Sequence, residues 1–565
     1  MYSALAVFSL IAALANVKLV QLLGGPLTYE WLYYSDFMRS PDLRNVLWST
    51  ESRMVMGFMT LLSFALLLFS HWARKAIDYI NPKRLRLMIL IYVAVYFPFA
   101  TLWAKTRYRE TQNLQNPIIS FCQSMARAWW SPGLFTLKTS LVFDDLEDSN
   151  SVLTPLPIQR QDRRGVQNLI LVVLESVPAE YIDGYGSAYP ITPELDKYRQ
   201  RSALFRNIYA HTPSTNESLV SMLLSIYPWI SYQGITREHP DIVFPSLSSE
   251  LKKHGYRTAF FSAADLRFQR ADVFLAHRQF DNIEDYRNLS CNGYARDDST
   301  PIWHYMGSTD DECLVAPVIE FASKSRPAPF FAMIWTNNTH YPYYISGEEL
   351  NFGVKDASLN RYLNALHHGD KVIGKLLRDL ESRDLLDSTL VVVVGDHGEA
   401  FGRHQQISHA TKIYEENVHV PLILINQALF SGQEHSMIGG LVDLAPTIMH
   451  ALNHPSPPQW QGRSLFSDHK RNRTYFFASR SVFLFGYREA NRKHIVDATL
   501  NGLNNEREKA EGVKERTDEI YDLNDDPTET TNLAARFPDA VSQGQERLSA
   551  WVQYSNSFMK SLLMH

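Results

Sequence analysis

The sequence predicts an α/β fold with a mostly parallel sheet sandwiched by helices, preceded by an α-helical transmembrane region. From residue 166 onward, short runs of Val, Ile and Leu alternate with amphipathic segments. This alternation is typical of a parallel sheet covered on both faces. Before residue 105, uncharged apolar runs occupy 54–72 and 87–104. Each is close to the roughly 20 residues that a transmembrane helix needs.

A third apolar segment, 3–23, is interrupted by Asn16 and Lys18. We expect a third membrane span there; the alternative is a cleaved signal peptide, although the segment lacks the basic start of one. The loop "ARKAIDYINPKRLR" between the two stronger runs is rich in Lys and Arg. Basic loops stay in the cytoplasm. The chain after about residue 105 is therefore expected outside the cytoplasm, with the N-terminus inside.

At 565 residues the chain is too long for a single hydrophobic core, and this length predicts two or three units. Residues 106–165 are interpreted as an interfacial helix followed by an exposed linker. We expect the exported α/β domain at 166–540 and a C-terminal helix at 541–565. The net charge of −5 argues against a nucleic-acid partner, which normally requires a basic face.

Three cysteines are present. Cys291 and Cys313 flank a polar loop of the exported region, where a disulfide could form and persist. Two free thiols are the alternative, and Cys122 has no evident partner.

Strands and helices of the exported domain can be placed from their hydrophobic patterns. Strands are expected at 168–174, 258–263, 330–336, 389–395 and 420–426, and helices at 194–202, 246–255 and 362–384. In such sheets ligands bind at the carboxyl ends of the strands. The residues that directly follow each strand are therefore candidates for chemistry.

Carboxylates and imidazoles follow these strands. Glu175 follows the first strand, His340 follows the strand at 330–336, and Asp396 and His397 follow the strand at 389–395. His404 and His409 precede the last strand. An Asp-His pair alone is more often a surface feature, but together these residues predict a site for one divalent metal, zinc or manganese.

The stretch "HTPSTNES" at 211–218 is rich in hydroxyl groups and runs into an apolar helical segment. A divalent metal can lower the pKa of a hydroxyl and neutralise charge on a transferred phosphoryl or sulfuryl group. A serine or threonine of this stretch is therefore a candidate nucleophile.

Several motifs occur together across residues 166–535: "NLILVVLES", "LKKHGYRTAFF", "VVVVGDHGEAFG", "YEENVHVPLIL", "VDLAPTIMHAL" and "EIYDLNDDPTETTNLA". In this order they resemble the sulfatase-like branch of the alkaline phosphatase superfamily. That branch includes lipoteichoic acid synthases and the phosphoethanolamine transferases that modify lipid A. The resemblance implies the α/β fold expected above and a metal-dependent transfer or hydrolysis.

The nucleophile distinguishes the members of this branch. Type I sulfatases use C-x-P-S-R, and "HTPST" places His211 at the cysteine position, where it cannot support that chemistry. Counting back from "IYP" places Thr215 at the nucleophile position instead, with Ser214 and Ser218 as alternatives. Thr215 could also simply cap the helix that begins there, and a helix N-terminus favours an anionic intermediate as well.

The resemblance implies further roles. Glu175, Thr215, Asp396 and His397 resemble the primary metal ligands, whereas His340 and His409 resemble the histidines near the leaving or accepting group. Glu399 and His404 are weaker candidates. Ser176 after Glu175 resembles the transferases rather than the type I sulfatases. About three membrane spans, where the transferases typically have five, and a sulfatase-like tail depart from the transferase pattern.

The resulting hypothesis is a membrane-anchored, metal-dependent phosphotransferase. It would move a phospholipid head group, phosphoethanolamine or phosphoglycerol, to an extracytoplasmic glycan or lipid acceptor through a phosphothreonine intermediate. We expect a monomer in the bacterial inner membrane with a periplasmic catalytic domain. The alternatives are a membrane-anchored phosphodiesterase or sulfatase-like hydrolase and, in a different class, a non-catalytic lipid-binding sensor.

Overall fold

The computed structural model describes residues 165–289, 307–324, 328–343, 348–468, 470–480, 483–498 and 518–564, with a few isolated residues before 130. The chain divides into two compact units, Met1–Trp130 and Ser131–His565. Among the described residues no helix is long and apolar enough to cross a bilayer. The predicted spans at 3–23, 54–72 and 87–104 lie outside them apart from Gly57, and they stay predictions.

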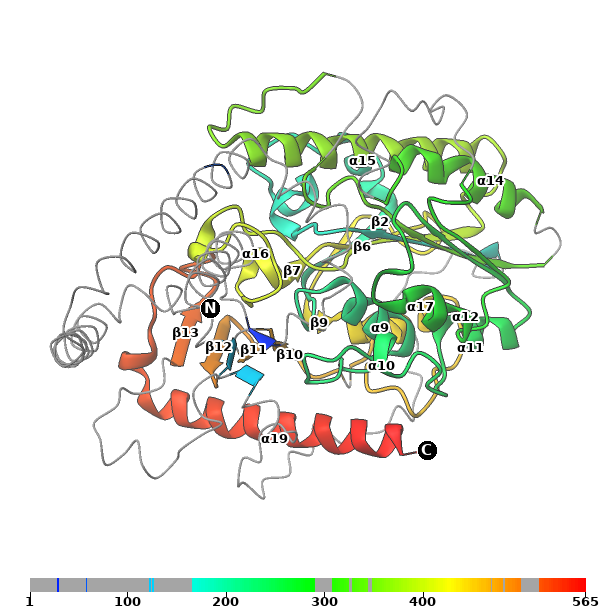
Figure 1. Cartoon of the computed structure of the whole chain (residues 1–565). Helices are drawn as coiled ribbons and strands as arrows, with labels where there is room; N and C mark the ends of the chain where they lie inside the picture. Colours follow the sequence, from blue (N-terminus) through cyan, green and yellow to red (C-terminus); the bar gives the residue numbers. More distant parts are fainter. Residues whose placement is uncertain are drawn as a thin grey trace, which may run out of the picture. The chain divides into compact units, whose positions relative to one another are not determined.

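A nine-stranded sheet forms the centre of the second unit (Figure 1). Its strands are β1 Asn168–Leu174, β2 Ser202–Tyr209, β3 Arg257–Ser262, β4 Asn282–Glu284, β5 Phe330–Trp335, β6 Thr389–Gly395, β7 His419–Val420, β8 Leu422–Ile425 and β9 Gln433–Gly440. Their order is β4-β3-β5-β1-β6-β8-β2-β7, with β9 paired to β2. From β4 to β6 all neighbours are parallel, which confirms the predicted parallel core.

The other edge of the sheet is mixed, and there the prediction of a mostly parallel sheet needs correction. β8 is antiparallel to both β6 and β2. A parallel return needs a crossover, usually a long helix, whereas residues 396–418 form only the four-residue helix α16 (Glu415–Val418) and a 3-10 turn. Pro421, which has no backbone N–H, divides the strand expected at 420–426 into β7 and β8.

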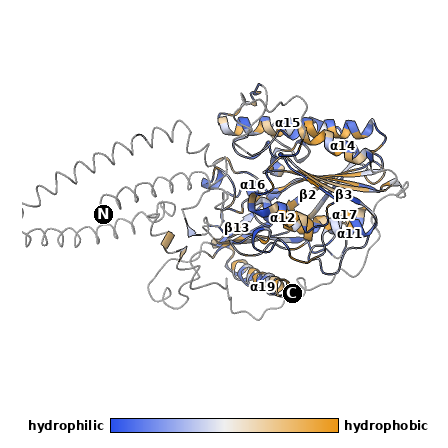
Figure 2. Ribbon diagram, turned by 45° about the vertical axis from the view of Figure 1, so that its right-hand side comes forward, coloured by the Kyte–Doolittle hydropathy of each residue, from blue (hydrophilic) through white to orange (hydrophobic). Residues whose placement is uncertain are grey.

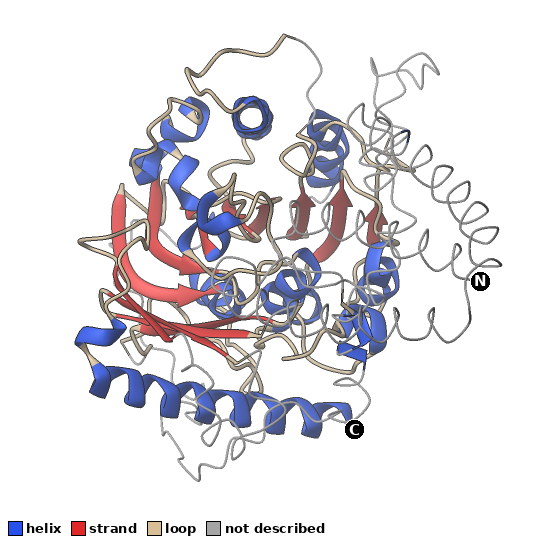
Figure 3. Cartoon of the chain, turned by 60° about the vertical axis from the view of Figure 1, so that its left-hand side comes forward, coloured by secondary structure: helices blue, strands red, loops and turns tan. Residues whose placement is uncertain are grey.

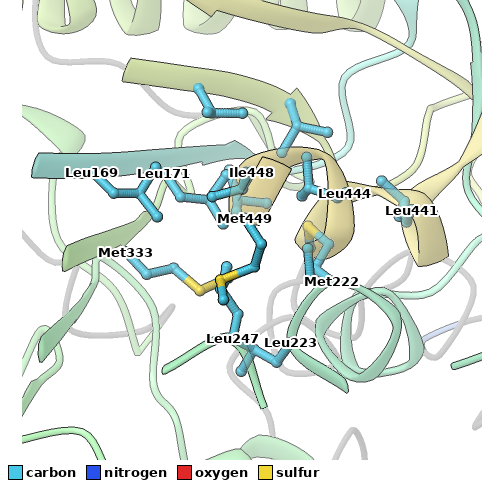
Figure 4. Close-up of a cluster of buried hydrophobic side chains, with 14 of the residues drawn as sticks. Leu169, Leu171, Met222, Leu223, Leu247, Met333, Leu441, Leu444, Ile448 and Met449 are labelled. Atoms are coloured by element: carbon cyan, nitrogen blue, oxygen red, sulfur yellow. The ribbon is translucent and has the colours of Figure 1, made fainter. Parts of the chain in front are cut away.

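Helices cover both faces of this sheet, as predicted. One face carries α9 Thr215–Leu224, α10 Ile235–Glu238, α11 Leu247–Lys253, α12 Ala271–Ala276 and α17 Leu444–Ala451; the other carries α8 Pro193–Asp196, α14 Val315–Lys324 and α15 Ala357–Glu381 (Figure 1). Side chains of β1 alternate between two cores. Leu169 and Leu171 pack in the first core, part of which Figure 4 shows, and Ile170 and Val172 pack in the second.

The amphipathic pattern of α15 places its apolar residues against the sheet. Figure 2 shows hydrophilic (blue) and hydrophobic (orange) residues alternating along this helix. Asp356 caps its start by accepting the N–H of Leu359 at 2.9 Å. The helix expected at 194–202 is shorter than predicted. α8 ends at Asp196 because the chain turns through Arg199–Arg201 into β2 at Ser202.

Eight short 3-10 turns connect the described helices and strands. They are η4 Ala179–Tyr181, η5 Asp183–Tyr185, η6 Arg199–Arg201, η7 Phe268–Arg270, η8 Asp311–Leu314, η9 Arg403–Gln405, η10 Leu441–Asp443 and η11 Ala534–Arg536.

A second, four-stranded antiparallel sheet was not predicted. It consists of β10 Arg473–Ala478, β11 Leu484–Glu489, β12 Arg492–Asp497 and β13 Asp518–Asp522 in that order. The long helix α19, Pro538–Leu563, runs beside it (Figure 3). Trp551 of α19 is fully buried and stacks on Tyr475 of β10 with ring centroids 5.0 Å apart. The C-terminal helix expected at 541–565 thus begins earlier, at Pro538.

A buried ionic cluster joins the second sheet to helix α16. Nζ of Lys493, on β12, lies 3.0 Å from Oε1 of Glu415 and 3.0 Å from Oε1 of Glu529. Oε2 of Glu529 also accepts the N–H of Glu415 at 2.6 Å. The second sheet and the tail after it therefore hold the start of α16.

Two of the three cysteines can be assigned. Cys313, in η8, is disulfide-bonded, and Cys122 is an exposed free thiol. The predicted partner of Cys313, Cys291, lies outside the described residues.

Candidate active site and metal centre

Three predicted metal ligands meet at the carboxyl ends of two neighbouring strands. Glu175 follows β1, and Asp396 and His397 follow β6, which pairs in parallel with β1. One potential ligand atom of each residue lies within 4.8 Å of those of the other two, and all three residues are buried. Nε2 of His397 lies 3.7 Å from Oε1 of Glu175 and 3.5 Å from Oδ2 of Asp396.

The backbone around this cluster is held tightly. Oδ1 of Asp396 accepts the N–H of Ser176 at 2.8 Å and the N–H of His397 at 2.7 Å. A Cβ at Gly398 would lie 2.1 Å from the carbonyl oxygen of Glu416. Only glycine permits this close approach, so the glycine of "DHG" fixes the position of the cluster against α16.

The donor set fits a divalent cation. Oδ2 of Asp396 is buried and has no hydrogen-bond partner among the described residues. Burial, together with the neighbouring Glu175 carboxylate, raises the pKa of Asp396 well above its usual range. Two close carboxylates in a desolvated site repel each other, and a divalent cation between them would remove that repulsion.

His397 has the protonation state that a metal ligand needs. Burial lowers its pKa to about 3, so the imidazole is neutral near pH 7. Its Nδ1 lies 3.1 Å from the carbonyl oxygen of Gly398, which can accept only from a protonated Nδ1. The lone pair is therefore on Nε2, which faces the two carboxylates.

Thr215 is the first residue of α9, and its hydroxyl lies at the edge of this cluster. Oγ1 is 3.4 Å from Oε1 of Glu175 and 3.3 Å from Nε2 of His397. Thr215 is partly exposed, unlike the three carboxylate and imidazole residues. A substrate can therefore reach the hydroxyl, whereas the three residues of the cluster are buried away from solvent.

The alternative nucleophiles have other partners. The Ser214 hydroxyl bonds Glu217, and the Ser218 hydroxyl donates to the carbonyl oxygen of Asp396 at 2.7 Å. His211, at the position of the sulfatase cysteine, is buried between Tyr475 and Val442. Its Nδ1 lies 2.6 Å from the Tyr475 carbonyl oxygen, and its Nε2 accepts the Val442 N–H at 3.0 Å.

Both predicted catalytic histidines, His340 and His409, lie beside the cluster. The ring of His409 is 4.3 Å from that of His397 and 6.2 Å from that of His340, between centroids. Both His340 and His409 are partly exposed. Two further imidazoles, which can donate or accept protons, therefore lie on the His397 side of the cluster.

The two weaker candidates have different positions. Glu399 is fully buried and pairs its Oε2 with Nδ1 of His409 at 3.2 Å. Nδ1 of His404 lies 2.6 Å from Oε1 of Glu416, and its ring stacks on Tyr414. His404 thus supports the loop before α16 and does not join the cluster.

Sequence reasoning missed one buried charge beside the candidate nucleophile Thr215. Nη2 of Arg480, from the segment after β10, lies 3.0 Å from Oγ of Ser214 and 3.3 Å from Oε1 of Glu217. Burial lowers the pKa of Arg480 to about 9. Arg480 is 266 residues away from Ser214 in the chain and follows a strand of the sheet that was not predicted. The sequence therefore contained no indication that the two residues are in contact.

Residues 167–454, just over half of the chain, match the family model named Sulfatase. The chain belongs to the sulfatase family. Residues 406–550 of this sulfatase-family protein also match a model described as the C-terminal part of N-sulphoglucosamine sulphohydrolase. The predicted resemblance is therefore confirmed, and the protein is an enzyme of the sulfatase and alkaline phosphatase superfamily, whose members use a divalent metal ion.

Two curated relatives represent different chemistries. Arylsulfatase K of Canis lupus familiaris is 21% identical over 467 residues, covering 69% of this chain and 83% of the relative. The lipoteichoic acid synthase-like YvgJ of Bacillus subtilis (strain 168) is 26% identical over 301 residues, covering 51% of this chain and 47% of the relative.

Solved structures share the fold. The lipoteichoic acid synthase LtaP from Listeria monocytogenes superposes with a TM-score of 0.53 at 21% identity, covering 72% of this chain and 96% of LtaP. An alkaline phosphatase superfamily protein from Vibrio parahaemolyticus gives a TM-score of 0.56 at 19% identity, covering 73% and 91%. At these identities the likeness establishes the fold of this sulfatase-family protein.

Proposed function

We propose that this sulfatase-family protein is a membrane-anchored phosphotransferase. It moves a phospholipid head group, phosphoethanolamine or phosphoglycerol, to an extracytoplasmic glycan or lipid acceptor. One observation carries the proposal: a threonine hydroxyl, that of Thr215, lies within 3.4 Å of Glu175 and 3.3 Å of His397. An unmodified hydroxyl at a metal cluster suits formation of a phosphoester and its passage to a second alcohol.

Glu175, Asp396 and His397, with Thr215 as a fourth ligand, would hold the divalent ion, zinc or manganese. When bound, the ion lowers the pKa of the threonine hydroxyl and offsets charge on the transferred group. The fixed tautomer of His397 and the bonds from Ser176 and His397 to Asp396 keep these side chains in place.

In the first step the Thr215 hydroxyl gives up its proton to the solvent, and its Oγ1 attacks the phosphorus of the donor phospholipid as an alkoxide, the form to which the second step returns it. The bond from phosphorus to the diacylglycerol oxygen breaks, and His409 or His340 gives that oxygen a proton. The head-group phosphate remains on Thr215 as an ester. The first-turn amides of α9 favour the anionic phosphate, because a helix N-terminus presents unpaired N–H groups.

In the second step an acceptor hydroxyl attacks the same phosphorus and the bond to Oγ1 of Thr215 breaks. The histidine that lost its proton in the first step takes the proton of the acceptor, which restores the enzyme. The predicted spans in the first unit would keep the site close to a donor that stays in the bilayer.

A hydrolase is the second candidate, in which water replaces the acceptor. Two observations favour it. Five arylsulfatase K relatives match 69–72% of the chain, and residues 406–550 match the C-terminal part of a sulphohydrolase. The same nucleophile would then serve a membrane-anchored phosphodiesterase or a sulfatase-like enzyme.

Intact-protein mass spectrometry tests the proposal. The full chain is incubated with liposomes of phosphatidylethanolamine or phosphatidylglycerol, with zinc or manganese supplied. We expect a mass increase equal to one phosphoethanolamine or phosphoglycerol, located at Thr215. Thr215→Ala should abolish it. Ser221→Ala is the matched control, because Ser221 lies on the same helix and its buried hydroxyl has no partner among the described residues.

Labelled phospholipid separates the two candidate reactions. Label in a glycan or lipid product supports transfer, whereas label released entirely as free head-group phosphate supports hydrolysis. Full transfer activity in Thr215→Ala would refute the assignment of the nucleophile.

A further inference from the structure

The loop that carries His340 is fixed by a carboxylate from a different segment of the chain. Oδ1 of Asp311 accepts the N–H of Asn337 at 2.6 Å, and Oδ2 accepts the N–H of Asn338 at 3.1 Å. We propose that Asp311 is a positioning residue that holds His340 in place for proton transfer. The proposal rests on the proposed function, in which His340 is a candidate proton carrier.

The contact between Asp311 and this loop is reciprocal. The backbone N–H of Asp311 donates to Oδ1 of Asn338 at 2.9 Å. Within the loop, the N–H of His340 donates to the carbonyl oxygen of Asn337 at 2.9 Å. Asn337 is thus bonded to Asp311 through its N–H and to His340 through its carbonyl, so two hydrogen bonds link the carboxylate to the backbone of the histidine.

The same loop is tied to the metal cluster on its other side. The N–H of Glu175 donates to Oγ1 of Thr336 at 3.1 Å, and the Thr339 hydroxyl donates to the carbonyl oxygen of Glu175. Residues 336–340 are therefore held between the main chain of Glu175 and the side chain of Asp311. Removing one of these attachments would leave the distance from His340 to the cluster less well defined.

Asp311 itself stands on a rigid base. It begins η8, whose start is capped by Asp310 accepting the N–H of Glu312 at 2.8 Å. Asp310 also bonds Nε2 of His368, on α15, at 2.7 Å. Cys313 in the same turn is disulfide-bonded. The turn η8 is therefore attached to helix α15 through Asp310 and, covalently through Cys313, to another part of the chain.

The carboxylate of Asp311 is suited to bonding two backbone amides at once. Asp311 is 1% exposed, and burying a charged group costs free energy unless it is well bonded. A carboxylate offers two acceptor oxygens to two successive N–H groups, whereas an asparagine offers one acceptor and one donor. Aspartate is thus the side chain that fixes both amides of the 337–338 segment.

Asp370 provides a matched control for this arrangement. Its Oδ2 accepts the N–H of Glu194 at 2.7 Å and its Oδ1 accepts the N–H of Leu195 at 2.9 Å. Like Asp311 it is 1% exposed, and burial raises the pKa of each to about 7. The amides bonded by Asp370 belong to α8, which carries none of the predicted site residues.

The test compares Asp311→Asn, Asp370→Asn and His340→Gln in the full-length protein. Both aspartate variants should lose a similar amount of thermal stability. Only Asp311→Asn should slow the same step as His340→Gln, by roughly 10- to 100-fold, because small displacements of a catalytic group have effects of that size. The affected step is read from the fraction of Thr215 that carries the covalent adduct during turnover.

Hydrogen–deuterium exchange gives a readout that does not depend on activity. Backbone amides of 336–340 should exchange faster in Asp311→Asn and at the wild-type rate in Asp370→Asn. If Asp311→Asn fails to fold, Asn338→Ala, which removes the reciprocal bond, should give the same pattern in a milder form.

Unchanged exchange at 336–340 in Asp311→Asn, or equal loss of activity in both aspartate variants, would overturn the proposal. A wild-type protein that forms no adduct would instead refute the proposed reaction. In that case faster exchange confined to Asp311→Asn would still support the attachment of the His340 loop, so the two failures are distinguishable.

Discussion

Oε2 of Glu399 lies 3.2 Å from Nδ1 of His409, and the Glu399 side chain is fully buried. A carboxylate at one ring nitrogen fixes the orientation of an imidazole and leaves the other nitrogen for the substrate. Glu399 follows His397 by two residues, so one short segment supplies both a predicted metal ligand and the support of a predicted catalytic histidine.

Glu399→Gln should therefore lower kcat by roughly 10- to 100-fold with little change in KM, because outer partners of catalytic histidines have effects of this size. Steady-state transfer kinetics measure it. Glu416→Gln is the control, since the side chain of Glu416, on α16, pairs with Nδ1 of His404 at 2.6 Å and not with a histidine of the candidate site. Equal kcat values for the two variants would contradict the role given to Glu399.

Metal binding should depend on Asp396. Asp396→Asn replaces the buried carboxylate whose Oδ2 lacks a partner among the described residues, and we expect its bound metal to fall from one equivalent to near zero. Elemental analysis of the purified protein measures this and identifies the metal. Saturating metal should stabilise the wild type by about 4 kcal/mol at a thousandfold excess over Kd, and the variant by far less. If neither added metal nor a chelator changes the melting temperature of the wild type, the proposed metal site would be refuted.

Stability should fall in mild acid through His211. Burial lowers its pKa to about 4, whereas a histidine in the unfolded chain titrates near 6.5. Between these values the unfolded chain binds the extra proton, so the contribution of His211 is complete above pH 6.5 and is lost as the pH falls toward 4. The full loss amounts to about 3 kcal/mol. Melting temperatures at pH 7.5, 5.5 and 4.5 should fall less steeply in His211→Gln than in the wild type.

The buried ionic cluster predicts a large effect from one substitution. Lys493→Met leaves Glu415 and Glu529 buried without their shared cation and should destabilise the protein by about 3–5 kcal/mol. Adding Glu529→Gln removes one of the uncompensated charges and should recover part of that loss. Thermal unfolding of the two variants provides the measurement, and a double variant less stable than Lys493→Met would count against the cluster as described.

Much of the site could be predicted because its residues follow apolar strands. Glu175, Asp396 and His397 were placed by the rule that strand ends converge, and β1 and β6 are indeed adjacent. Thr215 needed the family resemblance as well, since the stretch at 211–218 by itself contains four hydroxyl side chains.

Other features depend on contacts between distant segments and were missed. β11 and β12 contain charged residues such as Arg488 and Lys493, whose partners lie in other elements, so their pattern does not indicate buried strands. The antiparallel direction of β8 follows from the path of the preceding loop rather than from its own residues. The bonds of Asp311 to the His340 loop likewise join segments 26 and 27 residues apart.

The position of Glu529 has a consequence for biogenesis. Its carbonyl oxygen lies 3.0 Å from Nε2 of His404 and its carboxylate accepts the N–H of Glu415, although Glu529 follows these residues by 125 and 114 positions in the chain. The loop with His404 therefore cannot make these contacts on a nascent chain until residue 529 has left the ribosome. We expect ribosome-arrested chains that end before residue 529 to be inactive, because the segment that carries His404 and His409 is held by a stretch of chain that is synthesised well after it.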